Sequence, residues 1–222
     1  MKLDFQSREM TIKLVYYGPA LSGKTTNLQS IHEMAEGLTA GRLMTLETRD
    51  DRTLFFDLLP LKITTESNLN IRFKLFTVPG QVVHEATRKL VLQGADGIAF
   101  IADSQNNQTQ ANKEAFLDMH RNLKANGFDP KTHPTVIQFN KRDMHDIRTD
   151  EAIEAMAKAS PQPIYKATAI KHEGVIETLV GLIGTTWKDL EERHKLHEKF
   201  GIEPSEFLDT VRTALPPKKA SQ

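Results

Sequence analysis

The sequence has no cysteine among its 222 residues. This absence excludes disulfide bonds, thiolate metal sites, cysteine nucleophiles, and palmitoyl or prenyl attachment. Lys2 stands where N-myristoylation requires glycine, so no lipid anchor is expected. No apolar run approaches the roughly 18 residues of a membrane span, and residues 1–9 lack the apolar core of a signal peptide. We therefore expect a cytoplasmic protein with at most a peripheral contact with membranes.

The chain also has no excess of charge, with 29 basic and 29 acidic residues. Without a broad positive field, nucleic acid is not an expected partner. The length suits one large domain, which we place at residues 1–199, followed by an extension over residues 200–222.

What is present is a phosphate-binding loop, the pattern G-x-x-x-x-G-K-T over residues 18–25. Residues 11–17 read as a buried strand before it, and residues 26–36 as a helix after it, which is the context the motif requires. Glycines let the backbone approach phosphate oxygens, and the helix N-terminus favours the anion. Lys24 can reach the β- and γ-phosphates, and the Thr25 hydroxyl can ligate Mg²⁺. The expected phosphate-binding residues are Gly18, Ser22, Gly23, Lys24, Thr25 and Thr26.

Strands and helices alternate along the rest of the chain. Residues 61–64 and 71–77 alternate at period two and predict a hairpin. Further strands are expected at 97–102, 135–139 and 163–167, and helices at 82–92, 111–123, 150–159 and 175–190. This order predicts a three-layer α/β domain whose sheet is mostly parallel with one hairpin, and whose ligand lies beyond the carboxyl ends of the strands.

A second motif, Asn-Lys-Arg-Asp at residues 140–143, directly follows one of these strands. The Asp143 carboxylate can accept from guanine N1–H and the 2-amino group together, and adenine lacks both donors. Asn140 can bond both the base edge and the phosphate loop. The aliphatic stem of Lys141 can pack on the purine ring.

Together these motifs resemble those of a Ras-like small GTPase, and specifically the bacterial MglA family of gliding and polarity switches. The resemblance runs from about residue 8 to the mid-190s. It is carried by residues 18–27, 51–57, 77–81 and 140–143.

Residues 77–81, Thr-Val-Pro-Gly-Gln, stand where other small GTPases have Asp-x-x-Gly-Gln. Gly80 can offer its N–H to the γ-phosphate, and Gln81 can orient the attacking water, as the corresponding glutamine does in such enzymes. Thr77 replaces the aspartate that normally helps to hold Mg²⁺, so magnesium binding is expected to depend more on Thr25 and the nucleotide phosphates.

Residues 51–53 lie in the polar stretch that corresponds to switch I. Thr53 is the candidate to close over Mg²⁺ and the γ-phosphate. The resemblance implies that Arg52 is an arginine finger supplied by the same chain, although its position alone fits a solvated surface arginine. After the last strand, the Ala169 N–H, beside Thr168, is a candidate donor to guanine O6.

The resemblance implies GTP and GDP as ligands with Mg²⁺, and catalytic roles for Lys24, Arg52 and Gln81. It also implies a small Roadblock-type activating protein, MglB, as partner, and an output in motility or polarity, with recruitment to a cell pole. Two alternatives stay open: a GTP-binding module that does not hydrolyse, which the Thr77 substitution allows, and a P-loop kinase or ATPase. Residues 204–215 predict a short amphipathic helix that docks either on its own domain or on a partner.

Overall fold

The computed structural model describes residues 1–4, 6–35, 37–46, 56–65, 69–80 and 84–215. Its described strands form one mixed sheet in the order β3-β4-β5-β2-β6-β7-β8, with β1 paired to β2. The neighbours β5, β2, β6, β7 and β8 run parallel, whereas β4 pairs antiparallel with β5, and β3 with β4. The strands are β1 (Lys2–Asp4), β2 (Glu9–Tyr17), β3 (Met44–Leu46), β4 (Phe56–Thr64), β5 (Asn70–Thr77), β6 (Gly97–Asp103), β7 (Thr135–Asn140) and β8 (Ile164–Lys166).

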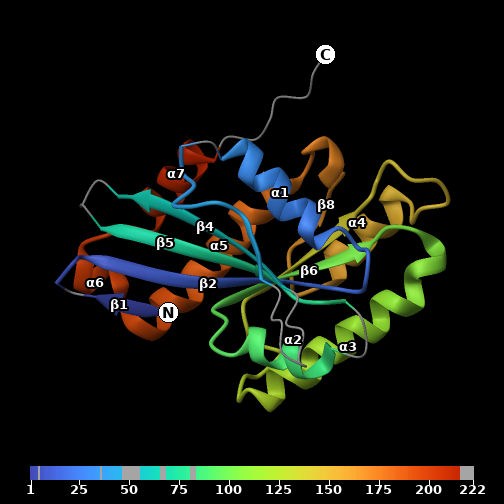
Figure 1. Ribbon diagram of the computed structural model, residues 1–222, viewed down its shortest axis with the longest axis horizontal. Coiled ribbons are helices and arrows are strands. Elements are labelled where there is room, and N and C mark those ends of the chain that lie inside the picture. The colour runs from blue at the N-terminus through green and yellow to red at the C-terminus, as the bar shows by residue number, and fades with distance from the viewer. Residues whose placement is uncertain (5, 36, 47–55, 66–68, 81–83, 216–222) are drawn as a thin grey trace.

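Helices cover both faces of this sheet, so the predicted three-layer α/β architecture is confirmed (Figure 1). Buried side chains of α1, α5 and α7 form one core against the sheet, and those of α2, α3 and α4 form a second core on the other face. The helices are α1 (Lys24–Met34), α2 (Glu85–Leu92), α3 (Thr109–Ala125), α4 (Asp150–Ala159), α5 (Val175–His194), α6 (Leu196–Phe200) and α7 (Pro204–Ala214), with short 3₁₀ turns η2 (Asn106–Gln108) and η3 (Ala169–Lys171).

The hairpin and the parallel strands expected from the sequence are all present, and β4 and β5 extend further than their alternating patterns indicated. The helix expected from residue 82 begins at Glu85 among the described residues. Among the described residues, five short elements were not predicted: β1, β3, α6 and the 3₁₀ turns η2 and η3. Each has only three to five residues, too few to show a hydrophobic period.

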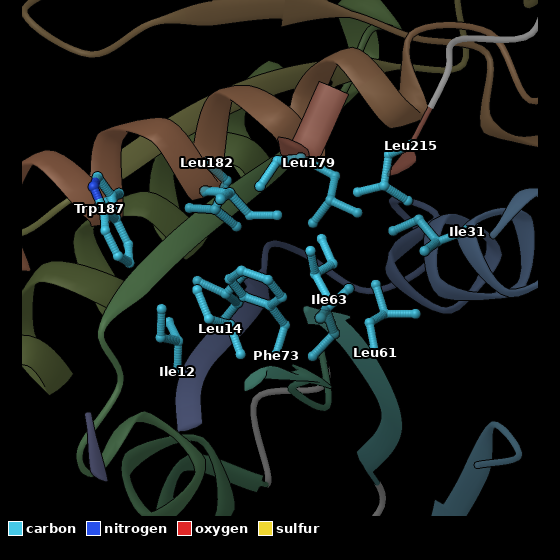
Figure 2. Close-up of a cluster of buried hydrophobic side chains, with 14 of the residues drawn as sticks. Ile12, Leu14, Ile31, Leu61, Ile63, Phe73, Leu179, Leu182, Trp187 and Leu215 are labelled. Carbon is cyan, nitrogen blue, oxygen red and sulfur yellow. The ribbon is translucent and has the colours of Figure 1, made fainter. Parts of the chain in front are cut away.

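The C-terminal segment docks on its own domain through the predicted amphipathic helix, α7. Phe207 is fully buried and its ring stacks on Trp187 of α5 with the centroids 3.7 Å apart. Leu215, just after α7, is also buried and lies near Ile31 of α1 in the same cluster as Leu61 (Figure 2). The last helix therefore completes the core between α1, α5 and β4.

The sheet brings the motifs together at one edge, as expected for a parallel α/β fold. In the register of the strands, Thr77 at the end of β5 is level with Tyr16 of β2, and Asp103 at the end of β6 is level with Asn140 of β7. The phosphate loop leaves β2 at this same edge. Within the described part of the chain, no helix has the length and apolar character needed to cross a membrane.

Candidate functional site

The phosphate loop is shaped by two glycines that no other residue could replace without strain. Gly18 has φ +148°, and a Cβ there would lie 2.2 Å from the carbonyl oxygen of Ile101. Gly23 has φ +95°, and a Cβ there would lie 2.2 Å from Nδ2 of Asn140. Gly23 is also the N-cap of α1, which begins at Lys24, so the helix N-terminus faces the loop. The loop therefore has the shape that the motif predicts for a phosphate-binding segment.

Lys24 lies in the first turn of α1 and is almost fully buried. Its Nζ donates to the carbonyl oxygens of Gly18 at 3.0 Å and Pro19 at 2.6 Å. Burial, with a smaller contribution from the nearby Arg88, lowers the pKa of Lys24 to about 8, while Asp57 acts in the opposite direction. A phosphate bound beside this amine would raise its pKa again and so favour its charged form.

A carboxylate that the sequence analysis did not single out lies beside Thr25. Asp57, on β4, is buried and accepts from the Thr25 hydroxyl at 2.7 Å through Oδ2. Thr77 Oγ1 donates to the same oxygen at 2.9 Å, and Thr45 Oγ1 donates to Oδ1 at 2.9 Å. Three hydroxyls from three segments therefore converge on one buried anion.

Asp57 supplies the negative charge that Thr77 lacks. The antiparallel pairing of β4 with β5 places Asp57 next to Thr77, whose hydroxyl also accepts from the Asp57 N–H at 2.8 Å. A hydroxyl and a carboxylate oxygen are hard ligands that suit Mg²⁺, which usually takes one or two protein ligands together with substrate phosphates and water. The described residues contain no group of three His, Cys, Asp or Glu side chains that could hold a metal without such help. Thr25 and Asp57 therefore fit a magnesium ion that arrives with a nucleotide.

The signal for Asp57 was present in the sequence but weak. Residues 51–57 formed part of the family resemblance, yet a single acidic residue beside the apolar Phe56 and Leu58 has no distinguishing pattern. Only the strand register, which pairs Leu58 with Phe76, places the carboxylate beside Thr77.

Asn140 joins the phosphate loop to the loop after β8. Its Nδ2 donates to the Ser22 carbonyl oxygen at 2.9 Å, and its Oδ1 accepts from the Ala169 N–H at 3.0 Å. The predicted contact of Asn140 with the phosphate loop is confirmed. In the structure the Ala169 N–H donates to Asn140 Oδ1. Donation from this N–H to guanine O6 stays a prediction. Thr168 is buried beside it and exchanges backbone hydrogen bonds with Glu173.

Two further residues of the 140–143 motif, Lys141 and Asp143, lie in the loop that follows β7. Lys141 is held by an ion pair to the buried Asp103, with Nζ and Oδ2 2.7 Å apart, so its stem has a fixed direction. Asp143 is exposed and its carboxylate is available to a ligand. The arrangement suits a role in which the Lys141 stem covers a base and the Asp143 carboxylate accepts hydrogen bonds from the edge of that base.

The phosphate end of the site is a cleft of about 680 Å³ between the phosphate loop and the ends of β4 and β5. Lys24, Thr25, Thr26 and Asp57 line it. Gly80 closes one side, and a Cβ there would lie 2.4 Å from the backbone nitrogen of Ala20. Three predicted site residues, Arg52, Thr53 and Gln81, lie outside the described residues.

The fold and the site define a P-loop protein with the Ras-like fold. No protein-family model matches the chain. The chain is 45% identical over 177 residues to the mutual gliding-motility protein MglA of Myxococcus xanthus (strain DK1622), a match that covers 80% of this chain and 91% of that protein. The chain belongs to the MglA family.

The role of Asp57 in magnesium binding can be tested with Asp57→Asn, which removes the charge and keeps the shape. We expect GDP affinity measured in Mg²⁺ to fall about tenfold, because a charge-assisted contact is lost. Affinity measured in EDTA should hardly change, which serves as the internal control. An equal loss in both buffers would show that Asp57 has no part in metal binding.

The lowered pKa of Lys24 predicts proton uptake on nucleotide binding. At pH 8.5 a group of pKa about 8 is mostly neutral, and bound phosphates would restore its charge, so binding should take up roughly three-quarters of a proton. Affinity should accordingly fall as the pH rises above 8.

Calorimetry at pH 8.5 in two buffers of different ionisation enthalpy measures this uptake. Lys188 is an exposed lysine on α5 and serves as the control: Lys188→Met should take up as many protons on GDP binding as the unmodified protein does. Binding of GDP without proton exchange at this pH would contradict the assignment to Lys24.

Proposed function

We propose that the protein is a molecular switch that binds GTP and GDP and hydrolyses GTP to GDP and phosphate. The observation that carries this proposal is the position of Asn140, which bonds the phosphate loop with one end of its amide and the loop after β8 with the other. The phosphate loop and the loop after β8, which we call the base-reading loop because the Ala169 N–H is a candidate donor to guanine O6, are thereby joined. Membership of the MglA family supports the same function.

Guanine selectivity would come from Asp143. Its exposed carboxylate, in the loop after β7, can accept from N1–H and the 2-amino group of guanine, whereas adenine would leave it without donors. Lys141, held in place by Asp103, would cover the ring with its aliphatic stem.

At the phosphate end, Thr25, Asp57 and Thr53 would hold Mg²⁺, and Lys24 would contact the β- and γ-phosphates. The ion would supply neutralisation of phosphate charge. Gly80, which lies against the phosphate loop, would offer its N–H to the γ-phosphate. Gln81 would orient the attacking water, and Arg52 would neutralise charge that develops on the transferred phosphoryl group.

The relative's name points to gliding motility, and we propose that this protein likewise controls motility or polarity, acting in the cytoplasm or at a cell pole. A Roadblock-type protein related to MglB would bind beside the switches and complete the catalytic geometry. Large apolar side chains are exposed at or beside the cleft: Leu21 of the phosphate loop lines it, and Met44 of β3 adjoins Thr45, which lines it. Such residues are suited to contact with a protein partner.

The rival proposal, a GTP-binding module without hydrolysis, drew its support from Thr77. The buried Asp57 weakens that support, because a carboxylate is present beside Thr25 even though β5 does not provide it. Phosphate release by the protein together with a Roadblock-type partner separates the two proposals.

Asp143→Ala tests the base-reading role. With Mg²⁺ present, calorimetry should show that the unmodified protein prefers GDP over ADP by roughly 10⁴-fold, and that the variant loses most of this preference. Glu151→Ala removes an exposed carboxylate at the start of α4 and should have no effect. If ATP displaced bound GDP at similar concentration, the kinase or ATPase alternative would be favoured instead.

Arg52→Ala tests the finger. In the presence of the Roadblock-type partner, the single-turnover rate of phosphate release should fall by roughly 10³-fold or more, because the transition-state charge loses its cation. Nucleotide affinity should stay close to normal. Arg42→Ala, a change at an exposed arginine ten residues earlier in the chain, is the control. Partner-stimulated hydrolysis that persists without Arg52 would rule out this role.

A further inference from the structure

Strand β7 carries two buried polar side chains on the same face of the sheet, Gln138 and Asn140. They are two residues apart, and side chains two apart on a strand point the same way. Asn140 at the edge forms the outer bridge, from the Ser22 carbonyl to the Ala169 N–H. Gln138 lies one layer deeper in the protein.

Gln138 is the centre of a second bridge between the same two regions. Its Nε2 donates to Asn27 Oδ1 at 3.0 Å and to Thr178 Oγ1 at 2.8 Å. Asn27 Nδ2 donates in turn to the Gly23 carbonyl oxygen at 2.9 Å. The Thr178 hydroxyl donates to the Gly174 carbonyl oxygen at 2.7 Å. We call Asn27, Gln138 and Thr178 the inner bridge.

Both ends of the inner bridge lie at ligand-binding segments. Gly23 is the last glycine of the phosphate loop. Gly174 follows Glu173, which is paired with Thr168 through backbone hydrogen bonds of 3.0 and 3.3 Å. Gly174 has φ +70°, and a Cβ added there would lie 2.0 Å from the Lys166 carbonyl oxygen, so this position is tightly packed. A displacement of the backbone at Gly23 would therefore displace the backbone at Gly174 as well, and the reverse.

The inner bridge is costly, which argues that it has a role. All three of its side chains are completely buried, and Gln138 Oε1 has no hydrogen-bond partner among the described residues. An apolar residue at position 138 would avoid the cost of a buried amide with an unsatisfied oxygen. The preceding position of β7 on the same face, Val136, is equally buried and apolar.

We propose that Gln138 is a positioning residue that couples the phosphate loop to the base-reading loop, beneath the outer bridge and without touching the ligand. The proposal rests on the proposed nucleotide-binding function. A nucleotide can leave only when the phosphate loop and the base-reading loop have both released it. A rigid link between the two loops therefore slows dissociation. Loss of the inner bridge should therefore accelerate release of the nucleotide.

The experiment compares two isosteric changes on the same helix. Thr178→Val removes the hydroxyl that joins Gln138 to Gly174. Thr186→Val, eight residues later on α5, removes an equally buried hydroxyl that has no hydrogen-bond partner among the described residues. Gln138→Leu, close in volume, removes the centre of the inner bridge.

Dissociation of a fluorescent GDP analogue, chased with excess GDP, should be about tenfold faster for Thr178→Val and for Gln138→Leu than for the unmodified protein. Thr186→Val should dissociate at the unmodified rate. The increase in melting temperature on saturation with GDP should be smaller for the two bridge variants. A merely structural role would lower the melting temperature with and without GDP alike and leave the dissociation rate unchanged.

The outcomes separate this proposal from the proposed function. If the unmodified protein and Thr186→Val bind GDP, and Thr178→Val releases it at the same rate as they do, the inner bridge has no coupling role and the proposed function stands. If neither the unmodified protein nor Thr186→Val binds a guanine nucleotide, both proposals are wrong.

Discussion

The structure depends on the contact between Asn140 and the phosphate loop. The amide nitrogen of Asn140 donates to the Ser22 carbonyl oxygen and occupies the space that a side chain at Gly23 would need. A loop that must turn its N–H groups toward an anion has few internal hydrogen bonds, so its shape needs outside support. Asn140 gives that support and at the same time fixes the loop that contains Ala169.

Most of the fold and of the phosphate site could be predicted because their signals are local. The loop at residues 18–25 and the motif at 140–143 each follow a strand whose apolar run is visible in the sequence. Asp57 could not be found in this way, since its importance arises from pairing between strands and not from its neighbours in the chain. The inner bridge was missed for the same reason, because Asn27, Gln138 and Thr178 lie on three different elements.

The site divides its negative charge differently from the pattern expected of small GTPases. There the acid near the metal would be at position 77, whereas here a threonine occupies that position and the acid comes from the neighbouring strand. The Thr77 hydroxyl and the Asp57 carboxylate remain joined, so the exchange keeps both groups in one hydrogen-bonded pair. The motif alone points to position 77 for the carboxylate, whereas the strand pairing shows that Asp57 provides it.

The burial of α7 bears on how the protein can be shortened or extended. Phe207, Val211 and Leu215 cover Trp187 and the apolar side of β4, so a chain cut near residue 200 would present these surfaces to water. Such a fragment would tend to self-associate, and a globular protein fused directly after Leu215 would crowd a helix that is already packed. Tags are better tolerated at the end of a spacer that leaves this helix in place.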